Sequence, residues 1–175
     1  MNLGIHALSA ALLVTTIPAG AIAAAPATAS ATLIRSDGTE MGHANFTARA
    51  GGVWLDVNAT GLSPGSHGIH LHTTGACTTP DFVSAGGHWN PMHRKHGLKS
   101  PEGPHMGDLP NLDVDASGKG HAAGLIAGAT LDAGAMGLLD ADGSALVIHA
   151  GPDDNMTDPS GNSGGRQLCG VVKAD

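Results

Sequence analysis

From about residue 30 onward, apolar and polar residues alternate in short runs that turn-forming residues separate. The first runs are 31–35, 42–48 and 53–59, with Ser36-Asp37-Gly38 and Ala50-Gly51-Gly52 between them. Alternation with a period of two predicts β-strands buried on one face. Further runs follow at 67–73, 109–114, 120–126, 145–150 and 167–172. About eight short strands with turns between them predict one all-β domain, an antiparallel sandwich or barrel.

Two segments, 74–108 and 151–165, lack this alternation and are rich in Gly, Pro, Asp and Ser. Connections longer than about 12–15 residues are uncommon in compact domains unless they have a function. The composition agrees with strands and loops, because each of the 27 glycines would cost about 1 kcal/mol inside a helix. We therefore expect two long functional loops on a β scaffold.

The N-terminal segment has a different pattern. Residues 7–17 form an apolar run that is too short to span a membrane, which needs about 20 apolar residues. Small residues from Ala21 to Ala25 then supply cleavage sites of the A-x-A type. These features predict a cleaved signal peptide over 1–23, a mature domain over 24–175, and export, with the periplasm expected and the extracellular space as the alternative. The other interpretation is a buried helix that is retained.

The net charge of the chain argues against some classes of binding partner. Eight Lys and Arg against 15 Asp and Glu give a net charge of −7. That balance disfavours a nucleic-acid partner, which would require a basic surface, and we expect no membrane association after cleavage. The unusual feature is the number of histidines, which is 11 and exceeds the combined number of Lys and Arg.

The chain contains only two cysteines, Cys77 and Cys169. In an oxidising compartment, two cysteines in one domain are most simply explained by a disulfide, and two buried free thiols are the alternative. A bond across so long a loop would nominally stabilise the fold by about 4–5 kcal/mol.

Several histidines have positions that suit metal binding. His70 and His72 share one face of a predicted strand, whereas Ile69 and Leu71 face the core. His149 alternates in the same way with its apolar neighbours near the end of a distant strand. Two imidazoles side by side, with a third from another strand, form a candidate metal site.

The first long loop adds more candidate ligands. It carries His88 within a constrained Gly-Gly-His-Trp-Asn-Pro turn, and it also carries His93, His96, His105 and Asp108. Three imidazoles and one carboxylate suit tetrahedral Zn²⁺, and four imidazoles in a flattened arrangement suit Cu(II). The alternative is a solvated, histidine-rich surface loop.

The order and spacing of several motifs resemble the copper,zinc superoxide dismutases, in particular their exported bacterial branch. The resemblance covers residues from about 31 to 173. The motifs are PGSHGIHLH at 64–72, GHWNP at 87–91, KHG at 95–97, HMGDLPN at 105–111, VIHAGPDD at 147–154 and GNSGGRQLCG at 161–170. The fold that this resemblance implies is an eight-stranded antiparallel Greek-key barrel or sandwich, immunoglobulin-like, with two long functional loops.

The resemblance also implies two metals and their ligands. Copper would be held by His70, His72, His88 and His149. Zinc would be held by His88, His96, His105 and Asp108, so that His88 bridges the two metals. The implied activity is the dismutation of superoxide, a small-molecule substrate, to O₂ and H₂O₂ by a copper redox cycle, with zinc in a structural role.

Four further residues have roles that come from the same resemblance. Asp153 matches a carboxylate that links a copper histidine to a zinc histidine. Arg166 matches an arginine beside the copper that attracts the anionic substrate, and His88 would supply a proton to the departing peroxide. Cys77 would pair with Cys169. Relatives include monomers and homodimers, and the sequence leaves that choice open.

Three other functions compete with this interpretation. A non-catalytic copper-binding or copper-delivery domain on the same fold is the main alternative, although such domains usually lack part of the ligand set or the arginine. A zinc hydrolase would leave His70, His72 and His149 without a role. A purely structural secreted sandwich would explain the cysteines but not the histidines.

For the remaining histidines and several other side chains, we predict positions at the surface or in the core. We expect His67 to stabilise the turn before the strand that carries His70 and His72. We expect His93, His43 and His121 to be surface residues. Trp54 and Phe46 are predicted in the core, and Trp89 beneath the ligand loop. Arg94, Lys95 and Lys99 are candidates for steering the substrate, with ordinary surface charge as the alternative.

Overall fold

The computed structural model describes Met1 and residues 27–175, so the predicted signal peptide lies outside the described residues apart from Met1. Residues 27–175 form ten strands and one short 3₁₀ turn, η1 (Val83–Ala85). The strands are β1 (Thr28–Ile34), β2 (Glu40–Arg49), β3 (Gly52–Ala59), β4 (Gly65–His67), β5 (Ile69–His72), β6 (Leu112–Val114), β7 (Gly120–Ala127), β8 (Ala145–His149), β9 (Arg166–Val171) and β10 (Lys173–Ala174).

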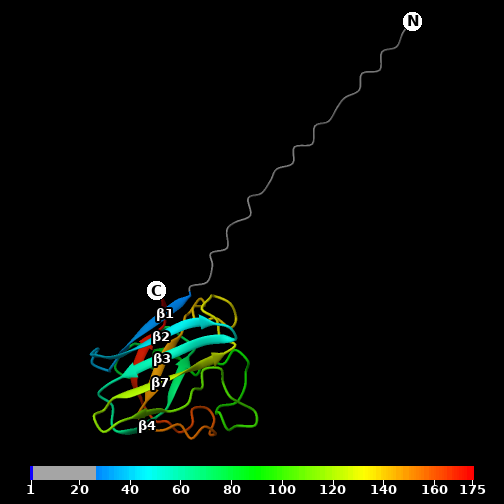
Figure 1. Ribbon diagram of the computed structural model, residues 1–175. Helices are drawn as coiled ribbons and strands as arrows, with labels where there is room; N and C mark the ends of the chain where they lie inside the picture. The colour runs from blue at the N-terminus through cyan, green and yellow to red at the C-terminus, as the bar shows by residue number, and fades with distance from the viewer. Residues whose placement is uncertain (2–26) are drawn as a thin grey trace.

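All ten strands belong to one antiparallel sheet with the order β4-β6-β7-β3-β2-β1-β9-β8-β5, and β10 adds to β1. The first and last strands of that order, β4 and β5, are consecutive in the chain and are joined through Gly68. The sheet therefore curls into a nearly closed barrel, which Figure 1 shows with β1, β2, β3 and β7 across one wall. This agrees with the predicted all-β antiparallel barrel.

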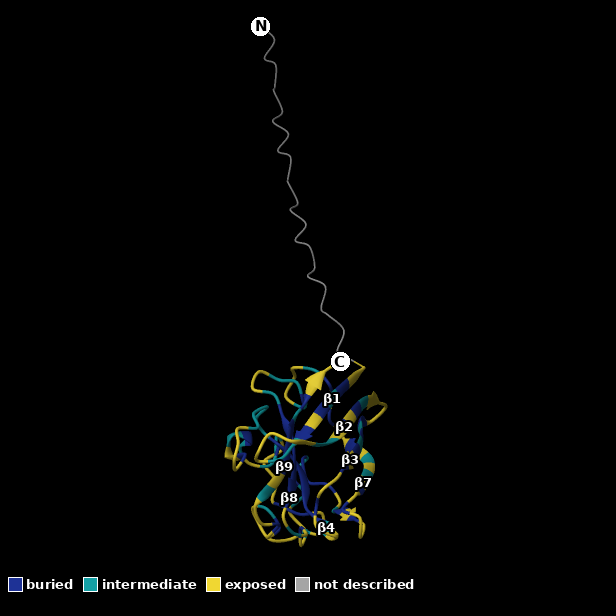
Figure 2. Ribbon diagram, turned by 90° about the vertical axis from the view of Figure 1, so that its left-hand side faces the viewer, coloured by how far each residue is buried: buried dark blue, intermediate teal, exposed yellow. Residues whose placement is uncertain are grey.

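The barrel interior is the main core. Along β3, Val53, Leu55 and Val57 are buried while Asp56 and Asn58 face outward, as the alternation predicts. The buried residues form a continuous interior between the walls (Figure 2). The largest fully buried side chains include Phe46, as predicted, and Leu33, Ile69, Leu112, Leu146, Ile148 and Leu168.

Trp54 was predicted in the core, and that prediction is wrong. It lies on the outer side of β3, partly exposed, with the guanidinium carbon of Arg49 4.6 Å from the ring centroid. The cause is its position between Val53 and Leu55, because in a strand only every second side chain can reach the interior. Trp89, which was predicted beneath the ligand loop, is 5% exposed and belongs to the core.

The predicted strand 67–73 is interrupted at Gly68. β4 pairs with β6, whereas β5 pairs with β8, so the chain changes partner at this glycine. Gly68 donates to the carbonyl of Gly151 at 2.8 Å, and its own carbonyl accepts from the amide of His149 at 2.8 Å. A Cβ here would lie 2.8 Å from the Cβ of Ser163 and 3.2 Å from Cε1 of His70, so no side chain fits at the junction.

Three long connections leave the barrel. Residues 73–111 join β5 to β6, residues 128–144 join β7 to β8, and residues 150–165 join β8 to β9. β6 begins at Leu112 and not at the predicted Leu109, because Pro110 has no N–H to donate to a ladder. Among residues 27–175, no helix is long and apolar enough to cross a membrane.

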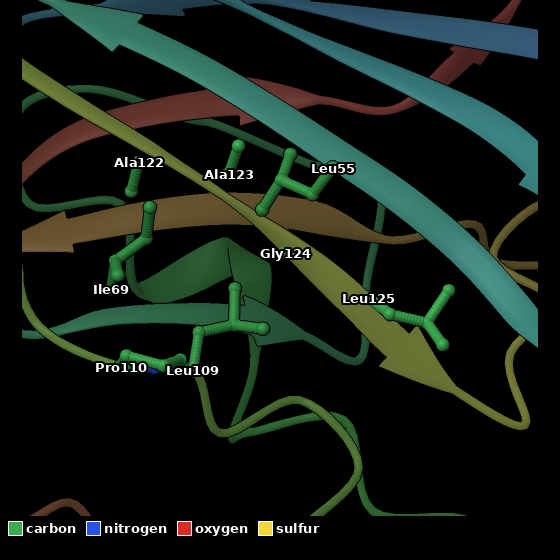
Figure 3. A pocket seen from close by; sticks show the side chains of 8 residues that line it. All are labelled: Leu55, Ile69, Leu109, Pro110, Ala122, Ala123, Gly124 and Leu125. Atoms are coloured by element: carbon green, nitrogen blue, oxygen red, sulfur yellow. The ribbon is translucent and has the colours of Figure 1, made fainter.

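β7 leaves a cavity in the barrel wall. Its inward positions include Ala122 and Gly124, and Gly124 pairs with Leu55 of β3. These small residues leave a hollow of about 160 Å³. Figure 3 shows Leu55, Ile69 and Leu109 around it, with Leu125 at the β7 side.

Candidate metal centre

Four histidines from three parts of the chain meet on the outer side of β5 and β8. His70 and His72 alternate along β5 with Ile69 and Leu71, which are buried in the core. His149 ends β8, the antiparallel neighbour of β5, and His88 comes from the first long loop. One nitrogen of each ring lies within 4.8 Å of the other three, and all four residues are buried or nearly so.

Hydrogen bonds fix which nitrogen each ring presents to this cluster. Nδ1–H of His72 donates to the carbonyl of Gly86 at 2.9 Å, and Nδ1–H of His149 donates to that of Gly164 at 3.1 Å. Nε2–H of His70 donates to Oδ2 of Asp153 at 2.6 Å. Among the described residues, the buried side-chain nitrogens without a partner are Nδ1 of His70 and Nε2 of His72, His88 and His149.

The four unpartnered nitrogens show whether the residues present could bind a metal. A buried polar atom without a hydrogen bond is costly and rare in a folded protein. Here the four face a shared point, and each carries a lone pair if the opposite nitrogen holds the proton. Four imidazole nitrogens are a suitable ligand set for copper. The residues therefore fit a copper ion.

A second cluster adjoins the first. Oδ1 of Asp108 lies 2.9 Å from Nδ1 of His88, 3.0 Å from Nδ1 of His96 and 3.3 Å from Nδ1 of His105. Corners of a tetrahedron around a metal lie about 3.3 Å apart when each ligand is about 2.0 Å from it. Three nitrogens and one oxygen at these separations fit a tetrahedral zinc ion.

His88 belongs to both clusters. Its Nδ1 lies near Asp108 and 3.4 Å from Nδ1 of His105, whereas its Nε2 has no partner. The ring also stacks on that of His70, with centroids 3.9 Å apart. One imidazole therefore presents one nitrogen to each cluster.

Asp153 connects the clusters from the opposite side. Its Oδ2 bonds Nε2 of His70 at 2.6 Å, and its Oδ1 bonds Nε2 of His96 at 3.0 Å. Asn111 holds the Asp153 backbone through two bonds of 2.9 Å, one to the carbonyl and one from the amide. Burial alone would raise the pKa of Asp153, but the bonds from His70 and His96 outweigh it and lower the pKa to about 2.

Three histidines of the first cluster, His72, His149 and His88, are neutral at pH 7. Burial lowers the pKa of His72 to about 2, of His149 to about 3 and of His88 to about 4. Neutral imidazole is the form that binds a metal. Burial opposes ionisation of Asp108, but hydrogen bonds from His105, His88 and the Gly97 amide hold its pKa well below the ordinary value.

Arg166 lies at the start of β9 beside the first cluster. Its Nη1 donates to the carbonyl of Phe82 and its Nη2 to that of Gly86, both at 2.6 Å. The disulfide between Cys77 and Cys169 joins the loop that carries these carbonyls to β9. Burial lowers the pKa of Arg166, but a guanidinium stays protonated in proteins. The cluster thus has one fixed positive charge beside it.

Within residues 27–175, the structure places the other histidines outside both clusters. His67 is buried, with Nδ1 2.7 Å from the carbonyl of His149 and Nε2 2.8 Å from that of Ser63, so it links the preceding turn to β8. His93, His43 and His121 are exposed. His43 pairs with Glu40 and His121 with Asp56, both at the surface.

The suggested steering residues Arg94, Lys95 and Lys99 are all exposed, and Lys95 forms an ion pair of 3.7 Å with Asp158. No sequence signal marks the carbonyls of Phe82 and Gly86 as functional, because any residue supplies a carbonyl. Asn111 belongs to the HMGDLPN motif, but its contact with Asp153 depends on two loops meeting.

Comparisons with known proteins agree with this geometry. The family model described as copper/zinc superoxide dismutase (SODC) matches residues 40–172. Superoxide dismutase [Cu-Zn] 2 of Aquifex aeolicus is 44% identical over 147 residues, which are 83% of this chain and 86% of that protein. Superoxide dismutase [Cu-Zn] of Caulobacter vibrioides is 42% identical over 148 residues, 83% of this chain and 85% of that protein.

A solved structure gives the same result for the fold. The crystal structure of an SOD-like protein from Bacillus subtilis superposes with a TM-score of 0.79 at 39% identity, over 82% of this chain and 97% of that one. With the family model covering most of the described barrel and all three long connections, the chain belongs to the copper/zinc superoxide dismutase family.

Proposed function

We propose that this protein dismutes superoxide, converting two superoxide anions and two protons to O₂ and H₂O₂. The observation that carries the proposal is the pair of clusters that share His88, with four unpartnered nitrogens directed at one point. His70, His72, His88 and His149 would hold copper, and His88, His96, His105 and Asp108 would hold zinc. Copper, when bound, supplies one-electron redox chemistry, which zinc does not.

The residues of the chain prepare the site for an anionic substrate. Arg166 keeps its guanidinium fixed by two carbonyls, so it attracts and orients the anion without losing side-chain freedom at that moment. This local charge matters because the whole chain carries −7 and offers no general attraction. Steering therefore acts over short distances.

His88 is the proposed proton donor for the peroxide product. Its Nε2 is the ring atom on the copper side, and its Nδ1 is held on the zinc side near Asp108. A proton carried on Nε2 would lie where the product forms, which is the geometric requirement for a general acid. Asp153 orients His70 and His96 by accepting hydrogen bonds from their Nε2–H groups.

Export is the second part of the proposal. We propose that residues 1–23 are removed and that 24–175 function in the periplasm, with the extracellular space as the alternative. The Cys77–Cys169 disulfide supports an oxidising compartment. The test is N-terminal sequencing of the chain secreted by a bacterial host, with a new terminus expected after Ala23 or close to it. A retained Met1 on the secreted chain would contradict cleavage.

The activity is tested on the mature chain loaded with copper and zinc. We expect one copper and one zinc per chain and rapid consumption of superoxide. His149→Ala should lose copper and activity but keep zinc, since His149 takes no part in the second cluster. His93→Ala, which removes an exposed histidine, is the matched control and should change neither metal nor rate.

Two results would overturn the proposal. Stoichiometric copper binding without turnover would favour the copper-delivery alternative, which the intact ligand set and Arg166 do not favour. Zinc binding with copper refused would exclude the two-metal site.

A further inference from the structure

The barrel wall has a gap on one side of β7, and the cavity of Figure 3 lies in this gap. β6 and β7 share a single register pair, Val114 with Gly120, whereas β7 pairs with β3 along its whole length. Among the described residues, no other strand pairs with β7. Pro110, in the segment before β6, has no N–H with which to extend the pairing. No ladder therefore closes the wall between β7 and residues 109–111.

The side chains around this cavity are apolar. Leu55, Ile69 and Leu109 line it and are 3%, 1% and 9% exposed. The inward positions of β7 hold Ala122 and Gly124, which are too small to fill the space beside them. None of the eight described residues that line the cavity has a polar side chain. The cavity therefore offers contact area to an occupant but no hydrogen bond from a side chain.

Size and polarity together define what fits. The cavity measures about 160 Å³, and an apolar cavity of about 150 Å³ can hold benzene or xenon. Water is a poor occupant, because a buried water needs two to four polar partners. Moving an apolar molecule out of water into apolar surroundings is favourable, by about 25 cal/mol for each Å² of surface buried. The cavity therefore favours small apolar molecules over water.

We propose that this cavity is a binding site for a small apolar molecule of about the size of benzene. Gly124 is the defining residue, because it lines the cavity and a Cβ there would meet nothing within 4 Å. Its φ is not positive, so a side chain at this position brings no backbone strain. The binding does not rest on the proposed dismutase activity, because no lining residue belongs to either metal cluster.

Binding is tested by titrating benzene into the mature protein loaded with zinc and reduced copper, both of which are diamagnetic. Methyl groups are followed by ¹H–¹³C NMR. Ring currents of the bound benzene should cause saturable shifts of the methyl groups of Leu55, Ile69, Leu109 and Ala122, which line the cavity. Xenon under pressure should shift the same methyl groups.

Substitutions on β7 locate the site. Gly124→Val places a side chain in the cavity and should abolish the saturable shifts. Gly124→Ala fills less of the space and should weaken benzene binding by less, so it serves if the valine variant does not fold. The matched control is Ala127→Val, which adds bulk to the same strand at an exposed position outside the lining and should keep the wild-type affinity.

Three results would overturn the proposal. The first is unchanged benzene affinity in Gly124→Val. The second is a set of shifts that do not saturate and that the exposed Val83, Met92 and Leu98 share, which would show partition onto the surface only. The third is a second copy of the chain at the cavity methyl groups, which isotope-filtered spectra of mixed labelled and unlabelled protein would reveal.

Discussion

Arg166 and His72 donate hydrogen bonds to the same acceptor, the carbonyl oxygen of Gly86, at 2.6 and 2.9 Å. One peptide group therefore fixes both the guanidinium that we propose attracts the substrate and one ring of the first cluster. A shift of this peptide would move both groups together. The loop that carries Gly86 is in turn attached to β9 through the Cys77–Cys169 bond.

The first prediction concerns Arg166. Arg166→Gln should lower kcat/KM for superoxide by about tenfold or more, because the fixed charge beside the cluster is lost. The rate of the wild type should fall with increasing salt, and the rate of the variant should depend on salt less steeply. Stopped-flow or pulse-radiolysis rates across ionic strength measure both effects. Copper and zinc content should stay at the wild-type level, and a variant that loses copper would show a structural role instead.

The second prediction concerns Asp153. Asp153→Asn replaces one acceptor oxygen by a donor, so it can accept from either His70 or His96 but not from both. Partners of this kind typically contribute 10–100-fold to metal affinity. We expect zinc affinity to fall within about that range in a chelator competition. Asp154→Asn alters a neighbouring exposed carboxylate outside both clusters and is the control. Equal zinc affinity in Asp153→Asn and the wild type would contradict the assigned role.

The strands could be predicted from the sequence. A strand that is buried on one face alternates apolar and polar residues, and this alternation is visible in the sequence. The same rule placed His70 and His72 on one face of β5. The rule also requires Trp54, between the buried Val53 and Leu55, to face outward, contrary to the core position predicted for it. The break at Gly68 had no such signal, since it depends on which strands are neighbours in space.

The loops are a different case. A 39-residue connection must fold back on itself to bring together His88, His96, His105 and Asp108. No local periodicity encodes that fold, so the residue pattern alone does not predict the cluster. The family resemblance does predict it. Contacts through backbone carbonyls, as at Phe82 and Gly86, leave no mark on residue type.

The third prediction concerns the disulfide. Its loop spans 92 positions, so closing it nominally stabilises the fold by about 4–5 kcal/mol through the unfolded chain. The double variant Cys77→Ala/Cys169→Ala, studied without metals, should lose stability of that order in urea denaturation. Each single variant should match the double variant, because the crosslink is lost in all three. A loss below about 1 kcal/mol would show that the crosslink adds little beyond the native packing.

The fourth prediction compares two glycines. Gly124 lies in β7 beside the cavity of Figure 3, and a Cβ there would meet nothing within 4 Å. Gly124→Ala should therefore stabilise the protein by about 0.5–1 kcal/mol, by restricting the unfolded chain. Gly161 has φ +61°, and a Cβ there would overlap Oδ1 of Asp153. Gly161→Ala should reduce both stability and zinc affinity. Urea midpoints and zinc titrations measure the pair, and a destabilised Gly124→Ala would refute the open cavity.

The fifth prediction concerns the metal-free protein at mildly acidic pH. Burial lowers the pKa of His72, His149 and His88 to about 2, 3 and 4, from 6.5 in the unfolded chain. Below pH 6.5 the unfolded state therefore binds more protons than the folded state, so stability is complete above pH 6.5 and is lost as the pH falls toward 4. Each of these histidines should cost up to about 1.4 kcal/mol per pH unit in that window.

Urea midpoints of the metal-free chain between pH 7.5 and pH 4.5 test this, since they should fall steeply below about pH 6.5. In His72→Gln the slope should be smaller, because one buried titrating ring is gone. His93→Gln, which removes an exposed histidine, should keep the wild-type slope. Metals that bind only the folded state add stability and compete with protons for the same nitrogens. The copper- and zinc-loaded protein should therefore hold its midpoint to lower pH, and a loaded protein with the metal-free profile would show that the buried nitrogens are not the ligands.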